Sequence, residues 1–116
     1  MVIRDREAWL DVWKRIHSPD PTHGPYSTLP PLPEIDFSRE MLIVVTLGAR
    51  PTGGYGIIVD AVYEQHDQLE VVVRSISPGK SCFVTQSTTQ PVDIVRLAKT
   101  ERSVVFRETD DVHKCK

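Results

Sequence analysis

The segment Arg-Pro-Thr-Gly-Gly-Tyr-Gly-Ile at residues 50–57 contains residue types that are common in ligand-binding loops. Adjacent glycines can hold a phosphate when the chain then enters a helix, because the free N–H groups of a helix N-terminus bind the anion. The residues after Gly54 alternate like a strand instead. We therefore predict a turn that closes a tight or bulged hairpin, in which Pro51 presets φ and both glycines supply φ above zero.

Residues 85–90, Thr-Gln-Ser-Thr-Thr-Gln, form the longest uncharged polar run in the chain. Such a run is typical of a solvated edge strand or loop. It can also pair with an incoming peptide by β-augmentation, because its side chains form hydrogen bonds without charge specificity. The candidate partner-binding residues at the glycine turn and on this run are Thr52, Tyr55, Gln86, Thr88 and Gln90.

Catalytic patterns are missing from the sequence, which contains no Gly-x-Ser-x-Gly, His-Glu-x-x-His or Gly-Lys-Ser/Thr motif. A Cys82 and His113 couple would need the base within hydrogen-bonding distance of the thiol, and nothing in the sequence brings the two together. Carboxylates that could be paired as acid and base are Asp36, Glu40, Asp60 and Glu64. Asp60 and Glu64 are explained by a position on the solvent-exposed face of a strand. We therefore predict no catalytic residue and no cofactor.

A metal site is also weakly supported. His17, Asp20 and His23 could bind zinc, but their spacing matches no recurrent ligand pattern, so no metal is predicted. The alternative hypothesis is a small ligand- or metal-binding protein or enzyme. Its pocket would lie between the proline-rich loop and the glycine turn, and would use His17, His23 or Tyr26.

Composition restricts the class of protein. With 116 residues, 40% apolar and 26% charged, the chain is long enough for one domain, residues 1–116. The net charge of −2 and the absence of long Lys/Arg runs argue against nucleic acid. No apolar stretch has the length of a membrane span, and the N-terminal residues 1–7 lack the apolar core of a signal peptide. We expect a cytoplasmic protein as the sequence stands, or an extracytoplasmic one if a leader was removed.

The two cysteines, Cys82 and Cys115, form no Cys-x-x-Cys pair. They can form a disulfide only if the C-terminal tail folds back onto the loop around Cys82. A domain of this size does not need such a bond, so we expect free thiols. The tail, residues 109–116, shows no pattern and is expected to fray.

Helical spacing appears near the N-terminus. Trp9, Val12, Trp13 and Ile16 recur every three or four residues, which predicts an amphipathic helix capped by Asp5. Residues 18–35 follow with six prolines and one glycine, and should form a surface connection. Their Leu-Pro-Pro-Leu-Pro stretch is also the kind of polyproline II ligand that binds an aromatic groove.

The rest of the chain is expected to be β-structure. Residues 41–48 are almost all apolar, as in a central strand covered on both faces. The polar Gln-His-Asp-Gln between two alternating segments predicts an antiparallel hairpin. The main strands are expected at residues 41–48, 55–64, 69–76, 92–97 and 103–108. Residues 2–3 and a segment from residue 82 are expected to form short strands. The predicted fold is therefore α+β, with one N-terminal amphipathic helix packed on a mostly antiparallel sheet of about five strands.

The order of these segments resembles one known family. A Trp-x-x-x-Trp helix is followed by IDFSREMLIVVTLGARPTGGYGI, a Val-rich strand, SPG and QSTTQPVDIVRL. This order is similar to the C-terminal domain of the protease complex subunit PrcB family, from about Ile3 to Phe106. Its marks are Asp36-Phe37, Gly48, the residues 52–55 and Gln90-Pro91.

The resemblance implies a small non-catalytic domain of an accessory subunit that associates with a bacterial surface protease, and it brings no catalytic residues. The expected partner is therefore another protein, such as a protease. A structural subunit that pairs with itself through an open sheet edge is a further alternative, and it would form a homo-oligomer.

Overall fold

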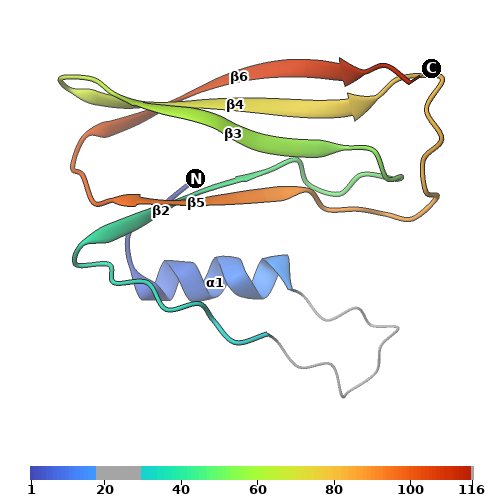
Figure 1. The fold of residues 1–116 in the computed structure, drawn as a ribbon. Helices are drawn as coiled ribbons and strands as arrows, with labels where there is room; N and C mark the ends of the chain where they lie inside the picture. The colour runs from blue at the N-terminus through green and yellow to red at the C-terminus, as the bar shows by residue number, and fades with distance from the viewer. Residues whose placement is uncertain (18–29, 116) are drawn as a thin grey trace.

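The computed structural model describes residues 1–17 and 30–115. Its elements in chain order are β1 (Val2–Ile3), α1 (Arg6–Ile16), β2 (Glu40–Thr46), β3 (Gly56–Glu64), β4 (Gln68–Pro78), β5 (Val92–Ala98) and β6 (Ser103–His113). Figure 1 shows two stacked layers of strands, with α1 on the far side of the layer that contains β2.

The described strands form two sheets of three, in the orders β1-β2-β5 and β3-β4-β6. All pairs are antiparallel except β4 with β6, which run parallel. The α+β class and the mostly antiparallel pairing are therefore confirmed, whereas the single sheet of about five strands is wrong. Local alternation predicted where strands occur, but it carries no signal for which sheet each strand joins.

Strand β2 is the centre of the core, as its apolar run predicted, because every residue from Met41 to Val45 is buried. Successive side chains of a strand point to opposite faces. One face contributes Met41, Ile43 and Val45 to a cluster with the buried Leu69, Val71 and Val73 of β4. The other face contributes Leu42 and Val44 to a second cluster, together with Ile3, Trp9 and Val12.

Helix α1 begins where the sequence predicted. The side chain of Asp5, in extended backbone conformation, accepts a hydrogen bond of 2.7 Å from the Ala8 N–H, which satisfies one of the free donors of the first turn. Trp9 is 2% exposed, so the helix buries a large aromatic surface.

The described part of the proline-rich connection, residues 30–35, runs beside α1 (Figure 1). The indole N–H of Trp9 donates to the Pro33 carbonyl at 3.0 Å, and that of Trp13 donates to the Pro30 carbonyl at 2.9 Å. This stretch of the polyproline candidate is thus bound by the chain's own tryptophans. Residues 18–29, with the predicted roles of Asp20, His23 and Tyr26, lie outside the described residues.

The two sheets meet at β3 and β5. The carboxylate oxygen Oδ2 of Asp93 accepts a 2.9 Å hydrogen bond from the Val59 N–H, next to a break in the β3–β4 register between Val59 and Ala61. The other oxygen, Oδ1, accepts one from the Ile94 N–H at 3.0 Å. One β5 side chain therefore satisfies a backbone donor of the other sheet.

The C-terminal residues differ most from expectation. Strand β6 continues to His113 and pairs with β4 along its whole length, so the predicted fraying from residue 109 is wrong. The tail folds back far enough for Cys82 and Cys115 to form a disulfide, so the expectation of free thiols is wrong. All but one of the 11 residues of β6 are exposed, so no hydrophobic alternation marked its second half.

Replacing Asp93 with alanine should lower the free energy of unfolding by about 1 to 3 kcal/mol, because the half-buried Val59 N–H loses its acceptor. Urea denaturation measures the change. The matched control is Asp67→Ala in the exposed β3–β4 hairpin loop, which should cost less than about 0.5 kcal/mol. Equal effects of the two substitutions would contradict the bridging role of Asp93.

Replacing both cysteines with serine should cost about 3 to 4 kcal/mol, since the disulfide closes a loop across a sequence separation of 33. Denaturation of the variant and of the reduced wild-type protein should give the same midpoint. Detection of both thiols by a thiol reagent in protein purified without reductant would contradict the bond.

A candidate binding surface at the glycine turn

The glycine turn, residues 50–55, lies against the polar run, residues 85–90. Arg50 and Thr89 exchange two backbone hydrogen bonds of 2.7 and 2.9 Å as an isolated antiparallel bridge. The Gly53 N–H donates to the Thr85 carbonyl at 2.9 Å. The structure therefore brings the two predicted partner-binding segments together into one surface, named here the turn surface.

The glycines allow this close approach, although of the two only Gly54 has the predicted φ above zero. Gly54 has φ of +88°, and a Cβ there would lie 2.9 Å from side-chain atoms of both Pro78 and Val84. The turn joins two strands, as predicted, but these belong to different sheets and do not form a hairpin. Because the Gly53 N–H is already bonded and β3 follows instead of a helix, the local geometry does not match a phosphate-binding loop.

The predicted residues of the turn take part in its internal bonding. The Thr52 hydroxyl donates to the Gly53 carbonyl at 3.0 Å, and the Thr52 carbonyl accepts from the Thr89 hydroxyl at 2.9 Å. The guanidinium carbon of Arg50 lies 5.7 Å from the centre of the Tyr55 ring, within cation–π range. Thr52 thus stabilises the turn, and Tyr55 positions Arg50.

The predicted residues of the polar run point outward. Gln86, Thr88 and Gln90 are all exposed, and the Gln86 amide donates only a long bond of 3.4 Å to the Val84 carbonyl. Gln90 also lines a hollow of about 320 Å³ at the end of α1. The other residues around it are Met1, Val12, Arg15, Ile16, Thr46, Gly48, Ala49, Pro91 and Val92.

Sequence reasoning missed Phe83. It was placed in a short strand from residue 82, but residues 82–85 form no strand, and the Phe83 side chain is fully exposed. Its neighbour Cys82 is tied to the end of β6 by the disulfide, and the Gly79 N–H donates to the His113 carbonyl at 2.8 Å. The signal that could have found Phe83 is its position beside a cysteine in an uncharged segment.

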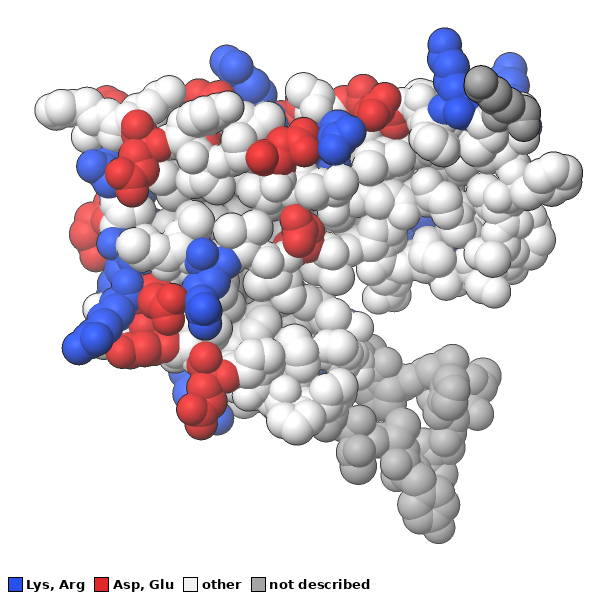
Figure 2. All heavy atoms as spheres, viewed as in Figure 1, with Lys and Arg blue, Asp and Glu red and all other residues white. Residues whose placement is uncertain are grey.

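Charge is nearly absent from the turn surface. Residues 81–92 contain no charged side chain, and residues 41–59 contain Arg50 as their only one. Figure 2 shows charged groups gathered where β5 leads into β6 and where α1 begins, whereas the opposite end is mostly uncharged. Depletion of charge and an exposed aromatic residue are typical of the centre of protein interfaces.

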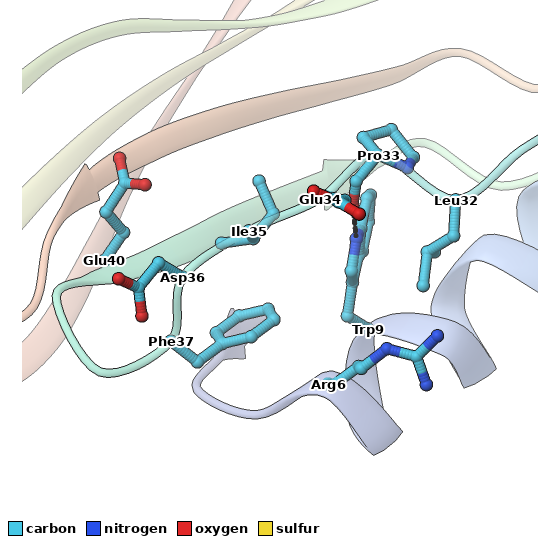
Figure 3. Close-up of a pocket in the computed structure, with 9 residues that line it drawn as sticks. All are labelled: Arg6, Trp9, Leu32, Pro33, Glu34, Ile35, Asp36, Phe37 and Glu40. Atoms are coloured by element: carbon cyan, nitrogen blue, oxygen red, sulfur yellow. Dashed lines mark hydrogen bonds between the residues drawn. The ribbon is translucent and has the colours of Figure 1, made fainter.

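A second hollow, of about 500 Å³, lies between α1 and residues 32–37. Figure 3 shows the Trp9 N–H aimed at Pro33 and the ring of Phe37 turned toward the hollow. Two carboxylates considered for acid–base roles line it, but both have local partners. The Ser38 hydroxyl and N–H bond to Asp36 and lower the pKa of its carboxyl, and Glu40 pairs with Arg96 at 3.1 Å.

Two of the remaining chemical candidates, Asp60 and Cys82, have partners, and Glu64 is exposed at the end of β3. Asp60 pairs with Arg74 at 3.2 Å. Cys82 lies near the His113 backbone, but its sulfur is in the disulfide and is not a nucleophile in this state. Among residues 1–17 and 30–115, no group of three or more His, Cys, Asp or Glu is arranged to hold a metal ion, and no helix there is long and apolar enough to cross a membrane.

The fold is a small α+β domain, and the turn surface on it carries little charge. The chain belongs to the PrcB C-terminal family, whose match covers residues 41–98, half of the chain. The match runs from β2 to β5 and includes both the glycine turn and the polar run. The predicted family is therefore confirmed, while α1, Asp36-Phe37 and β6 lie outside the match. Comparison with curated proteins and with solved structures gave no match.

Gly54→Ala should destabilise the domain by about 2 to 4 kcal/mol. Alanine is strained in the left-handed backbone conformation of this position, and its Cβ would clash with the side chains of Pro78 and Val84. Gly48→Ala is the matched control. Gly48 also has positive φ, of +73°, but nothing lies near its Cβ position, so about 1 to 2 kcal/mol is expected. Thermal denaturation of both variants measures the difference in stability. Equal losses of stability would mean that the close packing of the turn against Pro78 and Val84 does not require Gly54.

Proposed function

We propose that this domain is a non-catalytic protein-interaction module that serves as an accessory or stabilising subunit of a protease complex. Its binding site is the turn surface, with Phe83, Gln86, Thr88 and Gln90 as the contacting side chains. Membership of the PrcB C-terminal family supports the class of assembly. The observation that supports the site is the joining of two segments, with Arg50 as their one charged side chain, beside a fully exposed phenylalanine.

The bonding of the turn surface favours binding. Association loses free energy when loops must become ordered, so a loop that is fixed beforehand binds more tightly. The segment from Gly79 to Gln90 contains no strand, yet the disulfide, the Gly79–His113 bond and the Arg50–Thr89 bridge hold its backbone. Its outward side chains are therefore presented to a partner at low entropic cost.

The side chains of the surface also indicate the type of partner. A fully exposed large ring such as Phe83 gains about 25 cal/mol per Å² when a partner removes it from water. The surrounding amides and hydroxyls can then form hydrogen bonds at the rim. We infer a partner surface with an apolar depression and few charges.

The disulfide bears on the compartment. Such bonds persist in secreted, periplasmic and surface-exposed proteins and are rare where thiols are kept reduced. Cys82–Cys115 therefore favours the extracytoplasmic alternative over the cytoplasmic one. A partner protease would be met in the same oxidising compartment.

Photo-crosslinking in cells of the source organism tests the proposal. A benzoyl-phenylalanine at position 83 should capture a protease or protease precursor, identified by mass spectrometry. The same group at position 67, in the exposed β3–β4 hairpin loop, is the control and should not capture it. Capture of the same proteins from both positions, or of no protease from position 83, would refute the proposed role.

Binding to the captured partner should then fall at least about tenfold in Phe83→Ala, the usual size of a central aromatic contact. The triple variant Gln86→Ala/Thr88→Ala/Gln90→Ala should also bind more weakly. Because these side chains are exposed, the free energy of unfolding should change by less than about 0.5 kcal/mol per substitution. A stability loss as large as that of Trp13→Ala would show that the residues are structural.

A further inference from the structure

The two edges of the β3-β4-β6 sheet differ. The β3 edge has a register break beside Val59, whose N–H is bonded to Asp93 of β5. The β6 edge pairs with β4 from Ser103 to His113 without a break. In the part of the chain that the structure describes, no strand pairs with its other side. Bulges and covering groups protect strand edges from further pairing, so only the β3 edge is protected in this way.

The free side of β6 is long. A strand directs about half of its N–H and C=O groups to each side, so an 11-residue edge offers several backbone donors and acceptors. Figure 1 shows β6 at the outer side of its layer, away from β5. In the other sheet the edge strand β1 has only two residues and cannot cover a strand of this length.

The side chains of β6 differ between its two faces. On the outer face, Arg107 pairs with Glu70 at 3.5 Å and Asp111 pairs with Arg74 at 3.4 Å. Glu108 and Asp110 are on the inner face, where their register partners on β4 are Val73 and Ser75.

Neither inner carboxylate forms an ion pair with a described residue. The Ser75 hydroxyl donates to Asp110 at 2.5 Å. Both carboxylates line a hollow of about 330 Å³ with Leu47, Ile57 and Val73. Arg50 lines the same hollow, and its guanidinium lies over Tyr55. The hollow therefore contains one more negative than positive charge beside an open strand edge.

A second copy of the same strand fits this edge poorly. Antiparallel pairing about the middle of β6 would place Glu108 opposite Glu108 and Phe106 opposite Asp110. Like charges directly opposite each other destabilise a strand pair. A strand that carries positive charges would instead gain from the same two positions.

We propose that the free edge of β6 binds an extended segment of another protein with the pattern apolar-x-basic-x-basic-x-apolar. The segment adds a strand to the sheet by backbone hydrogen bonds. Its two basic side chains lie opposite Glu108 and Asp110, and its apolar side chains lie opposite the exposed Phe106 and Val112. Because the pattern is symmetric, it fits a parallel and an antiparallel strand. The strand edge and its two inner carboxylates lie outside the turn surface, although Arg50 of the glycine turn lines the same hollow.

Peptide titration of the isotope-labelled domain, followed by NMR, tests the proposal. The probe is the blocked peptide Thr-Val-Ser-Lys-Ser-Lys-Ser-Val-Thr, which should shift the amide signals of β6. The control peptide Thr-Val-Ser-Lys-Lys-Ser-Ser-Val-Thr has the same composition, but its lysines lie on opposite faces of a strand. We expect the control peptide to bind about threefold to tenfold more weakly.

Protein variants locate the contact. Glu108→Gln/Asp110→Asn should weaken binding of the first peptide about tenfold, since both opposite-charge pairs are lost. Asp111→Asn removes the same charge from the other face of the same strand and should change binding less than about twofold. Phe83→Ala should leave peptide binding unchanged, which separates this site from the turn surface.

Three results would overturn the proposal. One is the absence of shifts in β6 at millimolar peptide, and another is equal affinity for the two peptides. The third is a dimer in light scattering that dissociates in Glu108→Gln/Asp110→Asn, because the edge would then be occupied by a second copy.

Discussion

Burial of β2 on both faces is the constraint on which the rest of the structure depends. A strand whose residues from Met41 to Val45 are all apolar must be covered on two sides, because exposing either face leaves apolar area in water. The β3-β4-β6 sheet contributes one cover and the cluster with Trp9 and Val12 contributes the other. The layer order of the domain follows from this single strand.

The position of the turn surface follows from the same strand. The β2–β5 register pairs Thr46 with Val92, so the chain leaves β2 at the point where it enters β5. The Leu47 N–H then bonds to the Pro91 carbonyl at 3.2 Å, which keeps the two connections side by side. The glycine turn and the polar run, at least 30 positions apart in sequence, are therefore neighbours because of strand register.

Local patterns in the sequence predicted the helix, its Asp5 cap, the buried β2 and the β3–β4 hairpin. These features depend on contacts between near neighbours or on the covering of one apolar run. The division into two sheets, the end of β6 and the disulfide depend on pairings between distant segments. Residues 109–113 are exposed and carry two charges with no alternation, so only their pairing with β4 makes them a strand. For the site, the sequence indicated the two segments but missed Phe83, whose exposure depends on the position of Cys82.

The disulfide explains how a segment without regular structure can form a defined surface. Thirteen residues from Gly79 to Pro91 connect the end of β4 to the start of β5, and only Thr89 among them forms a β-bridge. Backbone of this kind would lose much conformational entropy if it had to become ordered on binding. The chain fixes it at one end by Cys82–Cys115 and at the other by the bonds of Thr89 and Pro91. Phe83 and Gln86 lie between these fixed points, so their backbone is restrained while their side chains remain free for contact.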